Sequence, residues 1–184
     1  MELHAFDECA ALAVSVDIAA DRLTLAYEFE NRSTGDLYLF NRLFHLFKDG
    51  GYPVDPDRVD IEIRRGSAVV SKKLVPIPDD MGVEYPHIPC VSRVAPGETY
   101  AERVNVALPL KPRTPYHREV GRVPRRRALH VELGYACGGP DPRGAPSVVP
   151  VTGGGTALLH DAFSEAEQRL LTLGPFGDVP TLED

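Results

Sequence analysis

Apolar and polar residues alternate one by one in two consecutive stretches near the N-terminus, residues 12–18 and 23–29. A period of two places successive side chains on opposite faces of a strand, so that one set is buried and the other meets water. The positions expected on the buried face are Leu12, Val14, Val16, Ile18, Leu23, Leu25, Tyr27 and Phe29. Because only residues 19–22 separate the two stretches, we predict a β-hairpin here.

Proline and glycine divide the rest of the chain into short segments. The 184 residues include 17 prolines and 16 glycines, and proline is excluded from helix interiors and central strands. Further strands are predicted at 37–47 (with a bulge or bend at Asn41), 59–63, 68–75, 91–94, 99–108 and 128–136, and residues 148–151 and 156–159 give only a weaker signal for a last pair. The pattern lacks the strand–helix alternation of a Rossmann fold or an α/β barrel. It predicts an all-β, antiparallel β-sandwich of about 7–9 strands.

A helix signal stands near the C-terminus. Ser164-Glu-Ala-Glu167 matches the capping box of a helix start, and Ala166, Leu170 and Leu173 recur at helical spacing before Gly174-Pro175. We therefore predict a short C-terminal α-helix followed by a loose acidic tail. The predicted organisation is a β-sandwich domain over 1–160, with the helix and tail over 161–184 packed on it or trailing from it.

Two local signatures resemble those of bacterial immunoglobulin-like domains. Residues 23–33 form a strand that ends in Asn31-Arg-Ser33 and turns into the aromatic-rich stretch Leu37-Tyr-Leu-Phe40, as the second strand of such domains does. Val94-Ala-Pro-Gly-Glu98 is similar to the turn that these domains carry before a late strand, and small intracellular proteinase-inhibitor-like sandwiches share both features. The resemblance implies an immunoglobulin-like topology for the sandwich. It implies no activity and no site residues.

Charge is distributed unevenly along the chain. The net charge is −7, but residues 111–127 carry seven basic residues and one acidic residue, which gives this segment +6 and the remainder −13. Its densest part is Arg122, Arg125, Arg126 and Arg127, which we take as a candidate binding site for an acidic protein partner. The alternatives are a solvated loop that protects an edge strand and a segment that pairs with the acidic body or tail. Nucleic acid is not expected, because the protein is acidic overall and Tyr116 is the one aromatic residue in the segment.

A second candidate binding surface is the proline-rich connection at residues 76–89. Tyr85 and His87 offer aromatic and polar groups there, and loops on a rigid sandwich often carry binding residues. The alternative is a loop that folds back over the core.

Metal and cofactor sites are not expected. The six histidines lie far apart, and the sequence has no Cys-x-x-Cys pair. Asp55-Pro-Asp-Arg-Val-Asp60 superficially resembles a calcium loop, but it lacks the central glycine and one ligand, so we read it as a solvated acidic turn.

Catalytic signatures are weak. The sequence has no Gly-x-Ser-x-Gly elbow. Cys137 precedes a glycine turn at the end of a predicted strand, where a thiolate would be accessible, so an enzyme of the small hydrolase type using Cys137 or a histidine (His130 or His160) is an alternative. The spacing of Cys90 and Cys137 is near that of an immunoglobulin disulfide, but no tryptophan accompanies it. Free thiols are therefore expected.

The chain has no apolar run long enough to span a membrane. Its first residues include the acidic Glu2, Asp7 and Glu8, unlike a secretory signal, so a cytoplasmic location is expected. The sequence favours a non-enzymatic intracellular binding or interaction module, with a structural or inhibitory subunit of a larger complex as a further alternative.

Overall fold

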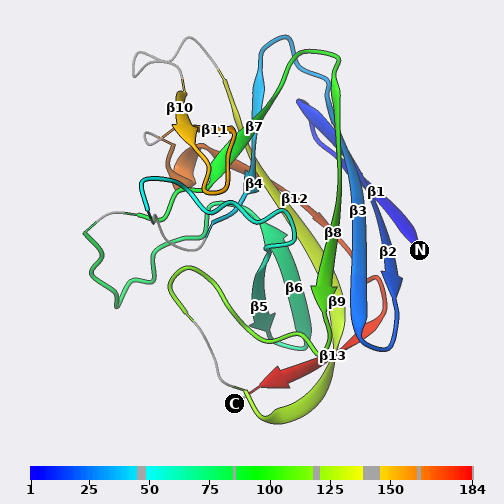
Figure 1. The fold of residues 1–184 in the computed structure, drawn as a ribbon. Helices are drawn as coiled ribbons and strands as arrows, with labels where there is room; N and C mark the ends of the chain where they lie inside the picture. The colour runs from blue at the N-terminus through cyan, green and yellow to red at the C-terminus, as the bar shows by residue number, and fades with distance from the viewer. Residues whose placement is uncertain (45–48, 85, 118–120, 139–145, 161–162, 184) are drawn as a thin grey trace.

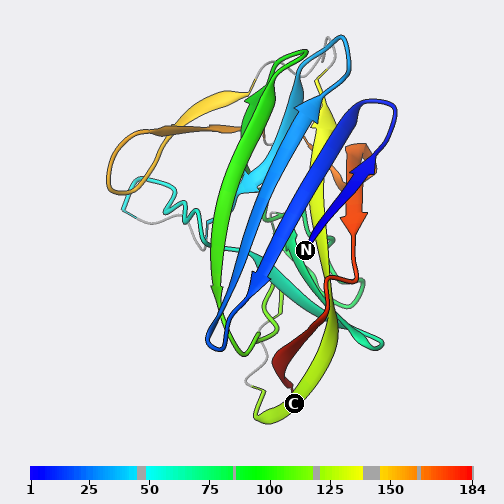
Figure 2. The same ribbon diagram turned by 90° about the vertical axis from the view of Figure 1, so that its right-hand side faces the viewer.

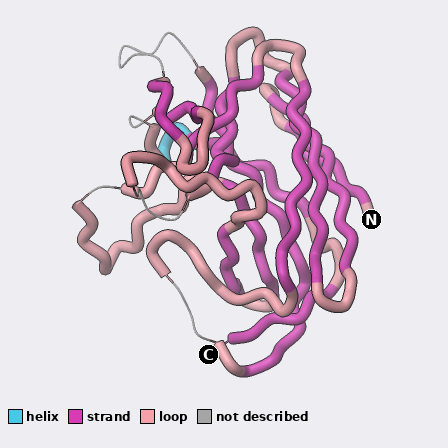
Figure 3. Tube along the Cα trace, in the orientation of Figure 1, coloured by secondary structure: helices cyan, strands magenta, loops and turns pink. Residues whose placement is uncertain are grey.

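The computed structural model describes residues 1–184 except 45–48, 85, 118–120, 139–145, 161–162 and 184. Among these described residues, thirteen strands and one 3-10 turn, η1 (Glu165–Glu167), make up the regular structure (Figures 1 and 3). The strands are β1 (Glu2–Phe6), β2 (Ala10–Ile18), β3 (Arg22–Asn31), β4 (Leu37–Arg42), β5 (Asp60–Arg64), β6 (Ser67–Lys72), β7 (Cys90–Val94), β8 (Thr99–Ala107), β9 (Val123–Cys137), β10 (Ser147–Pro150), β11 (Thr156–Leu159), β12 (Gln168–Leu173) and β13 (Asp178–Glu183). The all-β class is confirmed, with more strands than the 7–9 expected.

The strands form two sheets that pack face to face. The first sheet has the order β1-β2-β3-β8, and the second has the order β10-β11-β7-β4-β9-β6-β5, with β12 and β13 also paired to β9. Figure 2 shows the first sheet with its outer face toward the viewer. One cluster of buried apolar side chains draws on both sheets, including Phe29 and Leu25 from the first and Tyr135 and Leu129 from the second. The fold is therefore sandwich-like.

The predicted N-terminal hairpin is confirmed. β2 pairs antiparallel with β3 from Ile18↔Leu23 to Ala10↔Asn31, and burial alternates along both strands as the sequence pattern requires. The expected bulge at Asn41 is also confirmed, because the pairing of β4 with β7 shifts register between Leu39 and Arg42.

Asn31 joins the two local signatures at one corner of the sandwich. Its Nδ2 donates to the carbonyl oxygens of Gly35 and Val94, both at 2.8 Å, and its backbone carbonyl accepts from Gly97 N at 2.9 Å. Gly97 has φ 75°, and Glu98 N donates to Ala95 O at 3.0 Å, as in a type II turn. The turn before β8 is thus held against the end of β3.

β9 organises the second sheet. One edge of β9 pairs with β4 and β6, and its other edge pairs with β12 and β13. The pairing of β6 with β9 is parallel, from Ser67↔Ala128 to Lys72↔Leu133. The expectation of a purely antiparallel sandwich is therefore wrong: β7 and β8 intervene in sequence between β6 and β9, which gives the chain room to return in the same direction.

The predicted C-terminal α-helix is wrong, since the described residues contain no α-helix. The capping contact does form, with Ser164 N donating to a Glu167 carboxylate oxygen at 3.0 Å, but it opens only the 3-10 turn η1. β12 then alternates, burying Leu171 and Leu173. The edge of β9 supplies backbone partners that override the local helical signal. The tail is not loose either, because β13 continues along β9.

Candidate functional site

The arginine-rich segment forms a two-stranded ribbon at one end of the molecule. Residues 123–127 of β9 pair with β13, in the register Arg125↔Thr181 and Arg127↔Val179. Figure 1 shows this ribbon at the lower end, beside the C-terminus. The parallel pairing of β9 with β6 begins only at Ala128. We call residues 122–127 together with β13 the basic ribbon.

The four predicted arginines differ in their partners. Arg127 makes a bidentate pair with Glu183, with Nε–Oε1 at 3.0 Å and Nη2–Oε2 at 2.7 Å, and this pair lowers the pKa of Glu183. Arg126 Nη2 donates to the carbonyl oxygen of Asp178 at 2.9 Å. The side chains of Arg122 and Arg125 are exposed, and neither has a carboxylate within ion-pair distance among the described residues. Arg127 therefore follows the alternative in which the basic segment pairs with the acidic tail.

The proline-rich connection lies against the body where it is described. Tyr85 falls outside the described residues. His87 N donates to the hydroxyl of Tyr116 at 2.8 Å, the His87 ring lies 4.5 Å from that of Phe44, and Ile88 is buried. This part of the connection therefore folds back over the core, which was the alternative to a binding surface. It also contacts the segment that leads into the basic ribbon.

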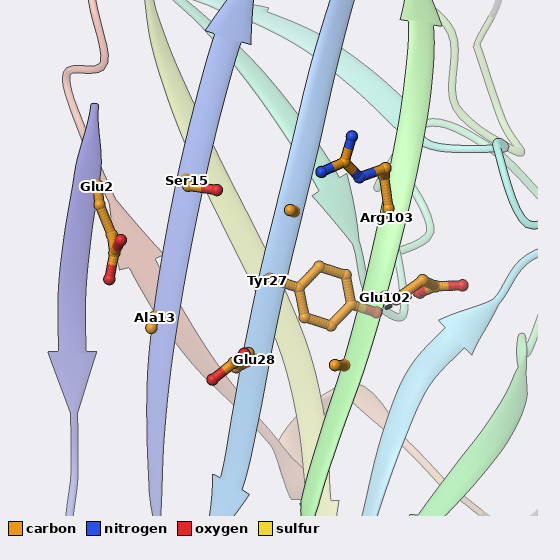
Figure 4. A pocket seen from close by; sticks show the side chains of 9 residues that line it. Glu2, Ala13, Ser15, Tyr27, Glu28, Glu102 and Arg103 are labelled. Atoms are coloured by element: carbon orange, nitrogen blue, oxygen red, sulfur yellow. Dashed lines mark hydrogen bonds between the residues drawn. The ribbon is translucent and has the colours of Figure 1, made fainter.

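A shallow hollow of about 390 Å³ lies on the outer face of the first sheet. Figure 4 shows Ala13 and Ser15 in this hollow, with Glu2, Glu28 and Arg103 around them. Sequence reasoning missed it, although a signal was present: several positions on the outward face of the alternation carry small side chains. Cross-strand neighbours such as Ser15↔Ala26 and Glu28↔Ala101 then leave space that larger residues would fill.

Beneath this hollow, a buried ion pair lies on the inner side of the first sheet. Lys72 Nζ is 3.1 Å from Glu102 Oε2, and the two side chains are 2% and 9% exposed. The ammonium also donates to the carbonyl oxygens of Asn41 and Pro56, at 3.2 and 2.8 Å, and Tyr27 OH donates to Glu102. Burial lowers the pKa of Lys72 and raises that of Tyr27. Each charge is compensated, so the arrangement is structural.

A second charged cluster occupies the opposite face of the second sheet. Lys73 Nζ lies 2.7 Å from oxygens of both Glu132 and Glu62, and Arg64 pairs with Glu132 at 2.5 and 3.0 Å. Burial opposes ionisation of Glu132, but the hydrogen bonds from Arg64 and Lys73 hold its pKa below the usual value. The described residues contain no group of carboxylates, histidines and cysteines arranged to hold a metal ion.

Asp60 belongs to this cluster and corrects the prediction of a solvated acidic turn. Asp55 and Asp57 are exposed, as that interpretation requires. Asp60, however, is 2% exposed as the first residue of β5 and lies across from Ser71, which in turn neighbours Glu132 on β9. Burial raises the pKa of Asp60 to about 7, so a neutral carboxyl group is favoured there below that pH.

The cysteines are free thiols, as expected. Cys137 lies with its Sγ 3.9 Å from that of Cys9, whereas Cys90 is buried between β4 and β11 in the second sheet. Burial and the contact with Cys9 raise the pKa of Cys137. His160 is buried and stacks on Phe163 with ring centres 4.2 Å apart. A raised thiol pKa reduces the thiolate available for attack, which weighs against Cys137 as a catalytic nucleophile.

No protein-family model, curated protein or solved structure matches this chain. Among the described residues, no helix is long and apolar enough to cross a membrane.

Proposed function

We propose that this protein is a non-enzymatic binding module that holds an acidic segment of a partner protein on its basic ribbon. The observation that carries the proposal is the bidentate pair of Arg127 with Glu183. It supports the ability of this ribbon to bind carboxylates in the geometry that arginine favours. Arg122 and Arg125 lie on the same ribbon with exposed side chains.

The backbone of the ribbon supports an extended partner. On the side opposite β13, residues 123–127 have no strand partner within the described part of the chain. A peptide that adds a strand to such an edge gains main-chain hydrogen bonds, and its side chains set specificity. Arg122 and Arg125 are three positions apart and so lie on opposite faces of an extended backbone, where carboxylates on both faces of that peptide would meet them.

We also propose that the sandwich is immunoglobulin-like. The contacts of Asn31 with Val94 and Gly97 support this, because both signatures of the resemblance belong to one corner of the molecule. On such a scaffold the rigid sheets position the ribbon, and the ribbon carries the binding residues.

The test is a titration of the full chain with a short synthetic peptide of consecutive glutamates, which presents carboxylates on both faces when it is extended. We expect the double variant Arg122→Glu/Arg125→Glu to weaken binding at least about tenfold, or about 1.4 kcal/mol. The matched control is Arg22→Glu/Arg65→Glu, which makes the same charge change at two exposed positions outside the ribbon and leaves binding within about twofold. Binding by the parent is also expected to weaken as salt rises.

Two results would reject the proposal. One is equal loss of binding in both double variants, which would reveal a response to net charge alone. The other is no binding by the parent protein at low salt, in which case the arginines serve to protect the strand edge from aggregation.

A further inference from the structure

Three consecutive residues of the β1–β2 turn contact the second sheet. The hydroxyl of Tyr135 donates to Asp7 Oδ2 at 2.5 Å, Arg169 Nη1 lies 2.7 Å from a Glu8 carboxylate oxygen, and Cys9 Sγ lies 3.9 Å from Cys137 Sγ. The cysteines are 128 positions apart in sequence. The turn therefore brings the two thiols together across the two sheets.

This approach of the thiols is held from both sides. The carboxylate of Asp7 accepts hydrogen bonds from Cys9 N at 2.8 Å and Ala10 N at 2.9 Å, which fixes the backbone of Cys9. On the other side, Tyr135 and Cys137 are alternate residues of β9 and point to the same face. Arg169 lies directly opposite Tyr135 in the pairing of β12 with β9. The ion pair of Arg169 with Glu8 therefore holds the β1–β2 turn close to Tyr135 as well.

We propose that Cys9 and Cys137 are a redox-sensitive thiol pair that closes to a disulfide linking the two sheets. A disulfide bond is about 2.05 Å long, so the sulfur atoms must approach by about 2 Å, which lies within the reach of side-chain rotation. Cys90 takes no part, because its side chain is buried elsewhere in the second sheet and burial raises its pKa to about 11.

The oxidant is a low-molecular-weight disulfide of the glutathione class. Because the pKa of Cys137 is raised, the reaction needs mildly alkaline buffer, in which the exposed Cys137 loses its proton. Its thiolate attacks one sulfur of the oxidant, which forms a mixed disulfide and releases one thiol. Cys9 then loses its proton and attacks Cys137 Sγ, which breaks the mixed disulfide and releases the second thiol. Two protein thiols are oxidised, one small disulfide is reduced to two thiols, and the two protons end on those thiols.

The experiment incubates the folded full chain with glutathione disulfide, blocks remaining thiols with iodoacetamide, and maps the cysteines by mass spectrometry. The expected product is a peptide pair joined through Cys9 and Cys137, with Cys90 alkylated after unfolding. The oxidised protein is expected to melt roughly 5–15 °C higher than the reduced protein.

Cysteine variants keep the proposal testable whichever position is sensitive to substitution. Cys90→Ala is the matched control and should form the same link, whereas Cys9→Ser should stop at the mixed disulfide on Cys137. The melting temperature of each reduced variant establishes that it is folded. The proposal would be overturned if the mixed disulfide persisted on Cys137 of the folded parent while Cys9 was found alkylated by iodoacetamide. A cross-link that forms only in denaturant would also overturn it.

Discussion

Lys73 Nζ lies 2.7 Å from Glu132 Oε2, and both side chains are almost fully buried, at 4% and 5% exposure. Glu132 also accepts two hydrogen bonds from Arg64. Glu62 pairs with the same two cations, so without Glu132 two cations would face one carboxylate. Removing one member of a buried pair leaves an unbalanced charge in a poorly solvated place, which costs far more than the pair itself contributes.

We therefore expect Glu132→Gln to lower the free energy of unfolding by about 3–5 kcal/mol. Urea denaturation measures the change. Glu28→Gln, on the exposed face of the first sheet, makes the same chemical change and should stay within about 0.5 kcal/mol of the parent. Similar losses in the two variants would show that burial of the Lys73–Glu132 pair is unimportant.

Stability should decline between mildly acidic and neutral pH because of Asp60. Its pKa is raised to about 7 by burial, against about 4 in an unfolded chain. The folded protein holds this proton more tightly than the unfolded chain, so the free energy of unfolding falls as pH rises from about 4 to about 7, by up to roughly 4 kcal/mol.

Asp60→Asn removes this titration, and we expect the variant to be more stable than the parent at about pH 8 and to lose its advantage at about pH 5. Urea denaturation of both proteins at the two pH values gives the difference directly. Comparing them cancels the contributions of other acids, such as Glu132, whose pKa is lowered. A parent–variant difference that does not change with pH would contradict the assignment to Asp60.

Gly121 controls how closely the start of the basic ribbon approaches β13. An added methyl group would overlap the backbone of Leu182 and Glu183, so Gly121→Ala should destabilise the protein by about 1–3 kcal/mol. Gly82→Ala is the control, since a methyl group there meets nothing within 4 Å. Thermal melting separates the two, and equal melting temperatures would mean that the ribbon tolerates a wider spacing.

Removal of residues 161–184 should expose one edge of β9. That edge pairs with β12 and β13 over most of its length, and a long unpaired edge promotes association between chains. We expect the shortened chain to elute as aggregates in size-exclusion chromatography with light scattering. A monomeric 1–160 fragment with the parent's circular dichroism would show that the two strands are dispensable.

The N-terminal hairpin could be predicted because its evidence is local. The alternation around Ile18 and Leu23 and the short turn between them lie within a few residues, and the pairing follows from them. The C-terminal strand could not be predicted in this way. Leu170 and Leu173 match helical spacing, while Leu171 and Leu173 match a strand, and the choice depends on an edge of β9 that only the folded sheet provides.

The residues of the candidate site likewise differ in whether local sequence could predict them. The clustering of Arg122, Arg125 and Arg126 is visible in the sequence, and pairing with the tail was among the alternatives considered. Lys72 and Lys73 gave no such signal. As neighbours on an extended backbone they point to opposite faces, and each meets a buried carboxylate far away in sequence, Glu102 or Glu132.

The position of β12 and β13 also fixes an order of events on the ribosome. β4 and β6 are made before β9, so one flank of β9 has its partners as soon as it emerges, but the other flank waits for segments translated later. The nascent chain therefore completes its second sheet only after residue 183 leaves the exit tunnel. Until then, that edge of β9 is unpaired and open to association with other incomplete chains.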